Sequence, residues 1–265
     1  MWFPMLFDEI RRLDIDDYRR IGFRGNPSPS ELRRLDERLE EKIREIRVPM
    51  EPLESELKEL IKQYFDGKEP PNIYILSREG GAWESYLQEG LKEYCHEKDI
   101  PFMEVHEGDI HEAGIGSIKY LMDLADVEKL VFFCEPGEQG YYAKLLEIEN
   151  AYIVGRGYDE GREIWGTEDK FKIFDLDDYP LAQEQLYEIL TRHIELIRIE
   201  DKGVISDEQL VKISQITHRP GYMLDILGVC LAVAAYKAKT GREPKITDYD
   251  IDNCSNRHII DRIAH

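Results

Sequence analysis

The sequence predicts an α/β fold, a three-layer parallel sheet with flanking helices, followed by a small all-helical domain. The first observation is the run Asn-Ile-Tyr-Ile-Leu-Ser at residues 72–77, which ends near Gly80 and Gly81 and is typical of a buried strand entering a tight loop. The second is the alternation of short apolar runs with helical patterns up to residue 196, which indicates parallel strands joined by helices. The third is the loss of strand patterns after Ser206.

Residues 1–50 are expected to form an N-terminal tail and an amphipathic helix. Residues 1–7 are apolar and are expected to dock either on the protein's own surface or on a neighbouring subunit. Ser30 is a candidate N-cap, and apolar residues then recur every three or four positions as far as Met50. This pattern fits a helix that packs on the following domain or forms a coiled coil.

The predicted core domain covers residues 51–199 and contains five candidate strands. They lie at residues 73–76, 102–105, 129–134, 151–154 and 171–174. One helix is predicted before the first strand, at residues 53–65, and others follow at 85–95, 117–125, 141–148 and 181–196. Helical crossovers between successive strands are what a parallel sheet requires.

Residues 200–265 are predicted to form the helical domain. Ser206 and Gln209 match the two ends of a capping box, which marks the start of a helix. A mostly apolar helix is expected over residues 223–239, and Thr247 is the candidate cap of a final helix. The longest apolar run, residues 226–236, has 11 residues and is too short to span a bilayer.

The composition is that of a soluble, acidic globular protein. The formal net charge is −20 and the pI is near 4.8, so the protein's field repels nucleic acid and anionic membranes, and we expect neither as a partner. The four cysteines form no C-x-x-C pair. We therefore expect no metal site, and unpaired thiols in a cytoplasmic, reducing environment.

The stretch around Gly80 and Gly81 has the strand-loop-helix setting of a phosphate-binding loop but not its residues. When G-x-x-x-x-G-K-[ST] is aligned on Ser85, the two glycine positions hold Arg78 and Trp83, and the lysine position holds Glu84. Two unit charges about 4 Å apart interact by roughly 4 kcal/mol at an effective dielectric constant of 20, so this reversal would cost up to about 8 kcal/mol. That is comparable to the free energy of micromolar binding. Gly80, Gly81 and Ser85 remain the candidate nucleotide-binding residues.

The order of these elements resembles the AAA+ ATPase superfamily over roughly residues 50–258. Five stretches carry the resemblance: the proline pair at 70–71, the second strand and pore-loop region at 102–116, the Walker B strand at 130–135, the sensor 1 strand at 152–157 and the helical lid at 206–253. The resemblance implies a P-loop NTPase-like fold, with ATP as the ligand and Glu135 as the acid that activates water.

The chemical positions of this resemblance hold unexpected residues. Cys134 stands where the family has the aspartate that supports magnesium, and Gly157, or Arg156 if the register moves by one, stands at sensor 1. With Glu84 at the lysine position as well, Glu135 would have neither metal nor lysine beside it. The resemblance therefore implies degenerate Walker A and Walker B motifs, with no catalytic residue unless Glu135 supports a residual ATPase.

We therefore predict a catalytically silent AAA+-like protein, a pseudo-ATPase that acts as a protein-interaction or ring-assembly module in homo- or hetero-oligomers. No cofactor is expected. One alternative is ATP binding without turnover, at the helix start near Ser85. Another is an enzyme or binding protein that uses the sheet for a different nucleotide or adenosyl cofactor, with Glu104 and Glu107 where a ribose-binding acid would lie.

Overall fold

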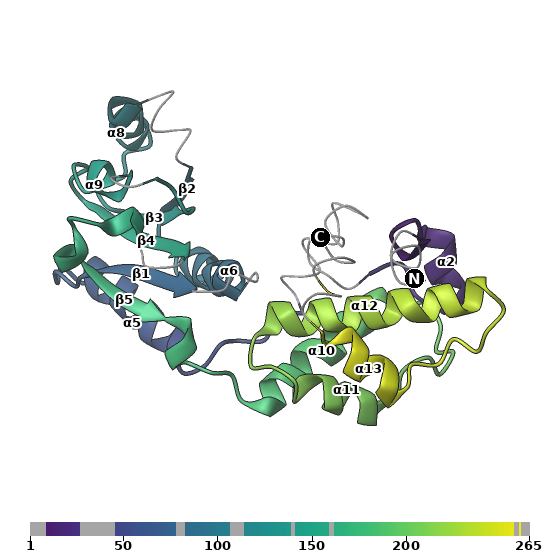
Figure 1. Ribbon diagram of the computed structural model, residues 1–265. Helices are drawn as coiled ribbons and strands as arrows, with labels where there is room; N and C mark the ends of the chain where they lie inside the picture. The colour runs from purple at the N-terminus through teal and green to yellow at the C-terminus, as the bar shows by residue number, and fades with distance from the viewer. Residues whose placement is uncertain are drawn as a thin grey trace. The chain divides into compact units, whose positions relative to one another are not determined.

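The computed structural model describes residues 9–26, 46–77, 83–106, 114–138, 141–158, 162–256 and 260 (Figure 1). The expected tail at residues 1–7, residues 31–45 of the expected amphipathic helix, and Gly80 and Gly81 lie outside these residues. Residues 46–50, where that helix was expected to end, are not helical. The chain divides into two compact units, one formed by Pro49–Pro180 and the other by Met1–Val48 with Leu181–His265.

The sheet unit is built on strands that all run parallel. The strands are β1 (Asn72–Ser77), β2 (Phe102–Val105), β3 (Leu130–Cys134), β4 (Ala151–Tyr158) and β5 (Phe171–Asp175). Their spatial order is β2-β3-β4-β1-β5. All of β3 and all but the first residue of β1 are buried, which is why these strands read as nearly continuous apolar runs. The predicted parallel sheet is confirmed.

Helices cover both faces of this sheet. They are α5 (Leu53–Phe65), α6 (Trp83–Glu97), α8 (Gly114–Leu124) and α9 (Tyr141–Leu145), with 3₁₀ helices at Arg162–Ile164, Glu168–Lys170 and Leu176–Asp178. On one face α5 packs against α6. On the other, Ile118 and Met122 of α8 share an apolar cluster with Tyr142 of α9 and Phe132 of β3. The predicted three-layer arrangement with flanking helices is therefore confirmed.

The second unit is helical. It contains α2 (Ile15–Arg20), α10 (Gln183–Ile197), α11 (Asp207–Ser214), α12 (Pro220–Lys239) and α13 (Asp248–Cys254). The capping box expected at Ser206 and the cap expected at Thr247 are formed, and their side chains accept hydrogen bonds from the N–H groups of Gln209 and Asp250. Helix α12 is long and apolar enough to cross a membrane by length and composition, and two thirds of its most apolar window is buried inside this unit.

Helix α10 and the N-terminal segment up to Val48 both belong to the helical unit. The sequence boundaries at residues 50 and 199 placed α10 with the core, whereas in the structure it packs against α11 and α12. The Arg192 side chain of α10 donates hydrogen bonds to the carbonyls of Ile46 and Arg47, at 3.2 and 3.0 Å. Lys239 of α12 pairs with the buried Asp17 of α2 at 2.6 Å. These contacts join segments that are remote in sequence, so no local pattern could reveal the grouping.

Candidate functional site

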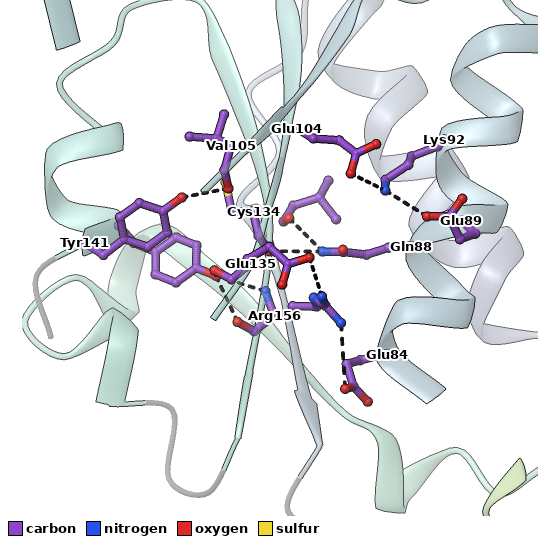
Figure 2. A network of polar contacts seen from close by, with 12 residues as sticks. Glu84, Gln88, Glu89, Lys92, Glu104, Val105, Cys134, Glu135, Tyr141 and Arg156 are labelled. Atoms are coloured by element: carbon purple, nitrogen blue, oxygen red, sulfur yellow. Dashed lines mark hydrogen bonds and ion pairs between the residues drawn. The ribbon is translucent and has the colours of Figure 1, made fainter. Parts of the chain in front are cut away.

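The candidate site lies at the edge of the sheet where the strands end. In open parallel sheets, ligands bind beyond the carboxyl ends of the strands, where the connections leave towards opposite sides. Here β1 and β4 are neighbours, and β1 leads to β2 on one side of the sheet while β4 leads to β5 on the other. The first turn of α6, the end of β3 and the end of β4 meet at this edge (Figure 2).

An arginine between two carboxylates forms the centre of the site (Figure 2). Nη2 of Arg156 lies 2.6 Å from Oε1 of Glu135, and Nη1 lies 3.8 Å from Oε1 of Glu84. The side chains of Arg156 and Glu84 are only 8% and 2% exposed, whereas that of Glu135 is 42% exposed. A guanidinium group suits this position because its planar fork can bind two carboxylates in fixed directions.

The three side chains together carry one net negative charge. Nearby, burial and then the Glu84 carboxylate raise the pKa of Tyr158, whose phenol therefore stays neutral and leaves the charge of the site unchanged. A polyphosphate entering here would meet two carboxylates and a guanidinium already committed to them. The arrangement therefore favours the ion pairs within the site over the binding of a polyphosphate.

Two neutral side chains fill the gap between β3 and β4. Pairing of these strands extends from Leu130↔Ala151 to Phe133↔Val154, and beyond that the strands part. On the α6 side, Nε2 of Gln88 donates to the carbonyls of Cys134 and Val154, at 3.3 and 3.2 Å (Figure 2).

Tyr142 of α9 closes the same gap from the opposite face. Its hydroxyl accepts a hydrogen bond from the N–H of Arg156 at 3.0 Å. It also lies 2.9 Å from the Arg156 carbonyl and 3.2 Å from the Glu135 carbonyl, to one of which it donates. The carbonyls of Cys134 and Val154 and the N–H of Arg156 are therefore satisfied by side chains.

Cys134, at the position where the AAA+ resemblance places a magnesium-supporting aspartate, is a core residue. It is buried in the apolar cluster on the α9 side of the sheet, and its Sγ lies 3.8 Å from the carbonyl of Phe132. Burial raises the pKa of the Cys134 thiol well above its ordinary value, so the thiol stays protonated. A neutral thiol is neither a nucleophile nor a metal ligand.

Gly157, the candidate sensor 1 residue, has no room for a side chain. A Cβ atom at this position would overlap the Tyr74 hydroxyl and lie 2.7 Å from Oε2 of Glu163. Tyr74 donates to that same Glu163 oxygen at 2.6 Å. The Tyr74–Glu163 pair therefore fills the space that a side chain at residue 157 would need.

Several other predicted site residues can now be placed. The backbone of Ser85 lies in the first turn of α6, whereas Gly80, Gly81 and Glu107 lie outside the described residues. Glu104 of β2 pairs with Lys92 of α6 at 2.8 Å (Figure 2). Within the described ranges, no group of three or more His, Cys, Asp or Glu side chains is placed to hold a metal ion.

Gln88 and Tyr142 were not predicted from the sequence as site residues. A signal for Gln88 was present, because Glu84 and Gln88 fall on the same stripe of α6 as the buried Leu87, Leu91 and Cys95. Polar residues at apolar spacing indicate a buried polar network.

Comparison with known proteins places the fold. No family model matches this chain, and no curated protein matches it. Among solved structures, a threonine-to-valine variant of Thermotoga maritima RuvB is similar, with a TM-score of 0.52 and 14% identity over 82% of this chain and 72% of that one. Thermotoga maritima RuvB described as a Holliday junction branch migration motor gives 0.51 and 14%, over 83% and 75%. The Aeropyrum pernix ORC1 protein in complex with DNA gives 0.49 and 16%, over 78% and 65%.

The fold is P-loop NTPase-like, as in RuvB. The similarity to AAA+ ATPases that the sequence predicted is confirmed at the level of the fold, at low sequence identity. The arginine site described above lies on this fold, at the ligand-binding edge of its parallel sheet.

Proposed function

We propose that this chain is a catalytically silent AAA+-like protein that acts as a protein-interaction or ring-assembly module and does not hydrolyse ATP. The observation that carries the proposal is the pairing of Arg156 with both Glu84 and Glu135. ATP hydrolysis on this fold requires a cation on the β- and γ-phosphates, a magnesium ion and an acid that is available to water. Glu84 supplies a negative charge where the cation on the phosphates is required, and Arg156 pairs with Glu135, the acid that would activate water.

The neighbouring positions support the same proposal. The neutral thiol of Cys134 and the filled space beside Gly157 leave two further ATPase positions without a polar group that faces a nucleotide. Three positions of one catalytic apparatus are therefore unsuited to it together, which supports degenerate Walker A and Walker B motifs and a pseudo-ATPase.

Exposed apolar side chains support a role in protein binding. Tyr120, Leu121 and Leu124 recur on one side of α8 and are 64%, 47% and 69% exposed, whereas Ile118 and Met122 on its inner side are buried. Exposed apolar side chains grouped on one side of a helix are found at protein–protein contacts. A homo-oligomer or a hetero-oligomer with a protein partner is consistent with this surface.

A turnover assay tests the silent-enzyme part of the proposal. The purified chain is incubated with MgATP, and phosphate release is measured beside the E135Q variant. We expect no release above the rate without protein, and no difference between the two chains. Steady hydrolysis that is abolished by E135Q would overturn the proposal.

Two binding measurements test the rest. Calorimetry with millimolar MgATP, and thermal shift with nicotinamide, flavin and adenosyl cofactors, are expected to show no binding. Binding of ATP would support a protein that binds ATP without turnover. Binding of another cofactor would support an enzyme or binding protein that uses the sheet for that cofactor. Native mass spectrometry of the protein purified from its own cells is expected to show an oligomer or a protein complex, and a monomer without partners would contradict the module.

A further inference from the structure

The arginine site joins three elements that are far apart in the sequence. Glu84 lies in the first turn of α6, Glu135 follows β3 and Arg156 lies near the end of β4, so each ion pair links one element to another. In P-loop NTPases, the nucleotide and its magnesium ion bridge the loop before the helix to the neighbouring strand end. We infer that the guanidinium group of Arg156 is a built-in substitute for a bound ligand, and that removing it leaves a site for a small guanidinium compound. This inference rests on the proposed function, because it names the group that occupies the silent site.

The geometry matches a guanidinium group more closely than an ammonium group. Arg156 uses two different nitrogens for its two carboxylates, Nη1 for Glu84 and Nη2 for Glu135. A lysine would present one compact charge in place of the planar fork, so it could not place a separate nitrogen against each carboxylate.

The ion pair between Arg156 and Glu84 is important for stability because the Glu84 carboxylate is buried. The Glu84 side chain is 2% exposed, so the carboxylate has almost no contact with solvent. A buried carboxylate that loses its cation is left with an uncompensated charge, which destabilises a protein much more than loss of a surface ion pair. The stability of the sheet unit therefore depends on a cation at the position of the Arg156 head group.

An exposed ion pair of the same unit provides a matched control. Lys172 of β5 pairs with Glu56 of α5 at 2.6 Å, the same distance as Arg156 to Glu135, but the two side chains are 45% and 41% exposed. K172A removes a cation of comparable geometry from a solvated position. It is expected to lower the midpoint of thermal unfolding by no more than about 3 °C.

The first experiment measures thermal unfolding of the full chain. R156A is expected to lower the midpoint by roughly 10 °C. Adding E84Q to R156A is expected to restore part of this loss, because it removes the charge that R156A leaves uncompensated. Equal shifts in R156A and K172A, or a double variant no more stable than R156A, would overturn the inference.

The second experiment is chemical rescue of R156A. Ethylguanidinium at millimolar concentration, far below the concentrations that denature proteins, is expected to raise the unfolding midpoint of R156A but not that of K172A. Ethylammonium at the same concentration is expected to have a much smaller effect. No rescue, or equal rescue by the two cations, would contradict a guanidinium site.

If R156A does not fold, R156K carries the test. Lysine keeps the charge but loses the fork, so R156K is expected to have a clearly lowered midpoint, and a wild-type midpoint would refute the inference. Failure here is distinct from failure of the proposed function. ATP turnover in the wild-type chain would reject the silent-enzyme proposal whatever R156A does, and an undisturbed R156A without ATP turnover would reject the built-in ligand alone.

Discussion

Replacing Glu84 with lysine restores the lysine of the phosphate-binding loop in sequence terms, yet the structure predicts that it destabilises the protein. In the alignment on Ser85, the lysine position is residue 84. In the structure this side chain is buried in the first turn of α6, facing the guanidinium of Arg156. E84K would therefore place two cations together where a cation and an anion now attract.

The separation of the two groups sets the magnitude. Oε1 of Glu84 lies 3.8 Å from Nη1 of Arg156. At an effective dielectric constant of 20, unit charges at this distance attract by about 4 kcal/mol, and a lysine would replace the attraction with a repulsion of similar size. For a lysine that keeps the position of the Glu84 side chain, the change in electrostatic energy is about 8 kcal/mol. Whole domains are stable by only about 5–15 kcal/mol.

Thermal unfolding with and without MgATP tests this prediction. E84K is expected to unfold at a much lower temperature than the wild type and to gain no stability from ATP. E84Q is the matched control, because it removes the negative charge without adding a positive one and leaves the Arg156–Glu135 pair intact. A nucleotide at about 100 times its Kd would stabilise the protein by about 2.7 kcal/mol. An E84K protein of wild-type stability that MgATP stabilises would refute the electrostatic account of the site.

Two further predictions concern buried positions. A methyl group at Gly157 would overlap the Tyr74 hydroxyl, so G157A is expected to lower the free energy of unfolding by about 1–3 kcal/mol in chemical denaturation, and an unchanged midpoint would contradict the packing described. Burial lowers the pKa of His193 in α10 to about 4, so the unfolded chain, with a histidine pKa of about 6.5, takes up this proton first as the pH falls. The stability linked to His193 is therefore fully present above about pH 6.5 and lost as the pH falls towards 4, by roughly 3 kcal/mol in all. H193F is expected to flatten this part of the pH dependence of stability, and parallel profiles for the two proteins would reject the assignment.

The central strands of the sheet were predictable because they are buried on both faces. Runs such as that of β3, Leu130–Cys134, need no partner information to be recognised as strands. The exception is β4, which was predicted to end at residue 154 and continues to Tyr158.

The missed half of β4 contains Gly155 and Gly157, which weaken the strand pattern. The structure gives the reason for both glycines, because a Cβ atom at Gly155 would lie 2.5 Å from Tyr142 and one at Gly157 would overlap Tyr74. These aromatic rings come from α9 and β1, so the requirement for glycine is visible only after folding.

The candidate site was predictable in position but not in composition. Glu84 and Glu135 were identified because a motif alignment assigns them to chemical positions. Arg156 entered only as an alternative register for sensor 1. That it binds both glutamates depends on β3 and β4 being neighbours and on α6 lying over them, which are long-range properties of the fold.

Charge alone does not close the site, and this bears on how a nucleotide site could be restored. Gln88 and Tyr142 bridge the parted ends of β3 and β4 from opposite faces through neutral hydrogen bonds to backbone groups. These bonds would remain after any change of charge at Glu84 or Arg156. Opening the gap to a ligand would require new partners for the carbonyls of Cys134 and Val154, since buried backbone groups left unpaired are costly. Restoring a single motif residue is therefore insufficient to restore nucleotide binding. The ion pairs of Arg156 and the hydrogen bonds of Gln88 and Tyr142 close the same edge of the sheet independently.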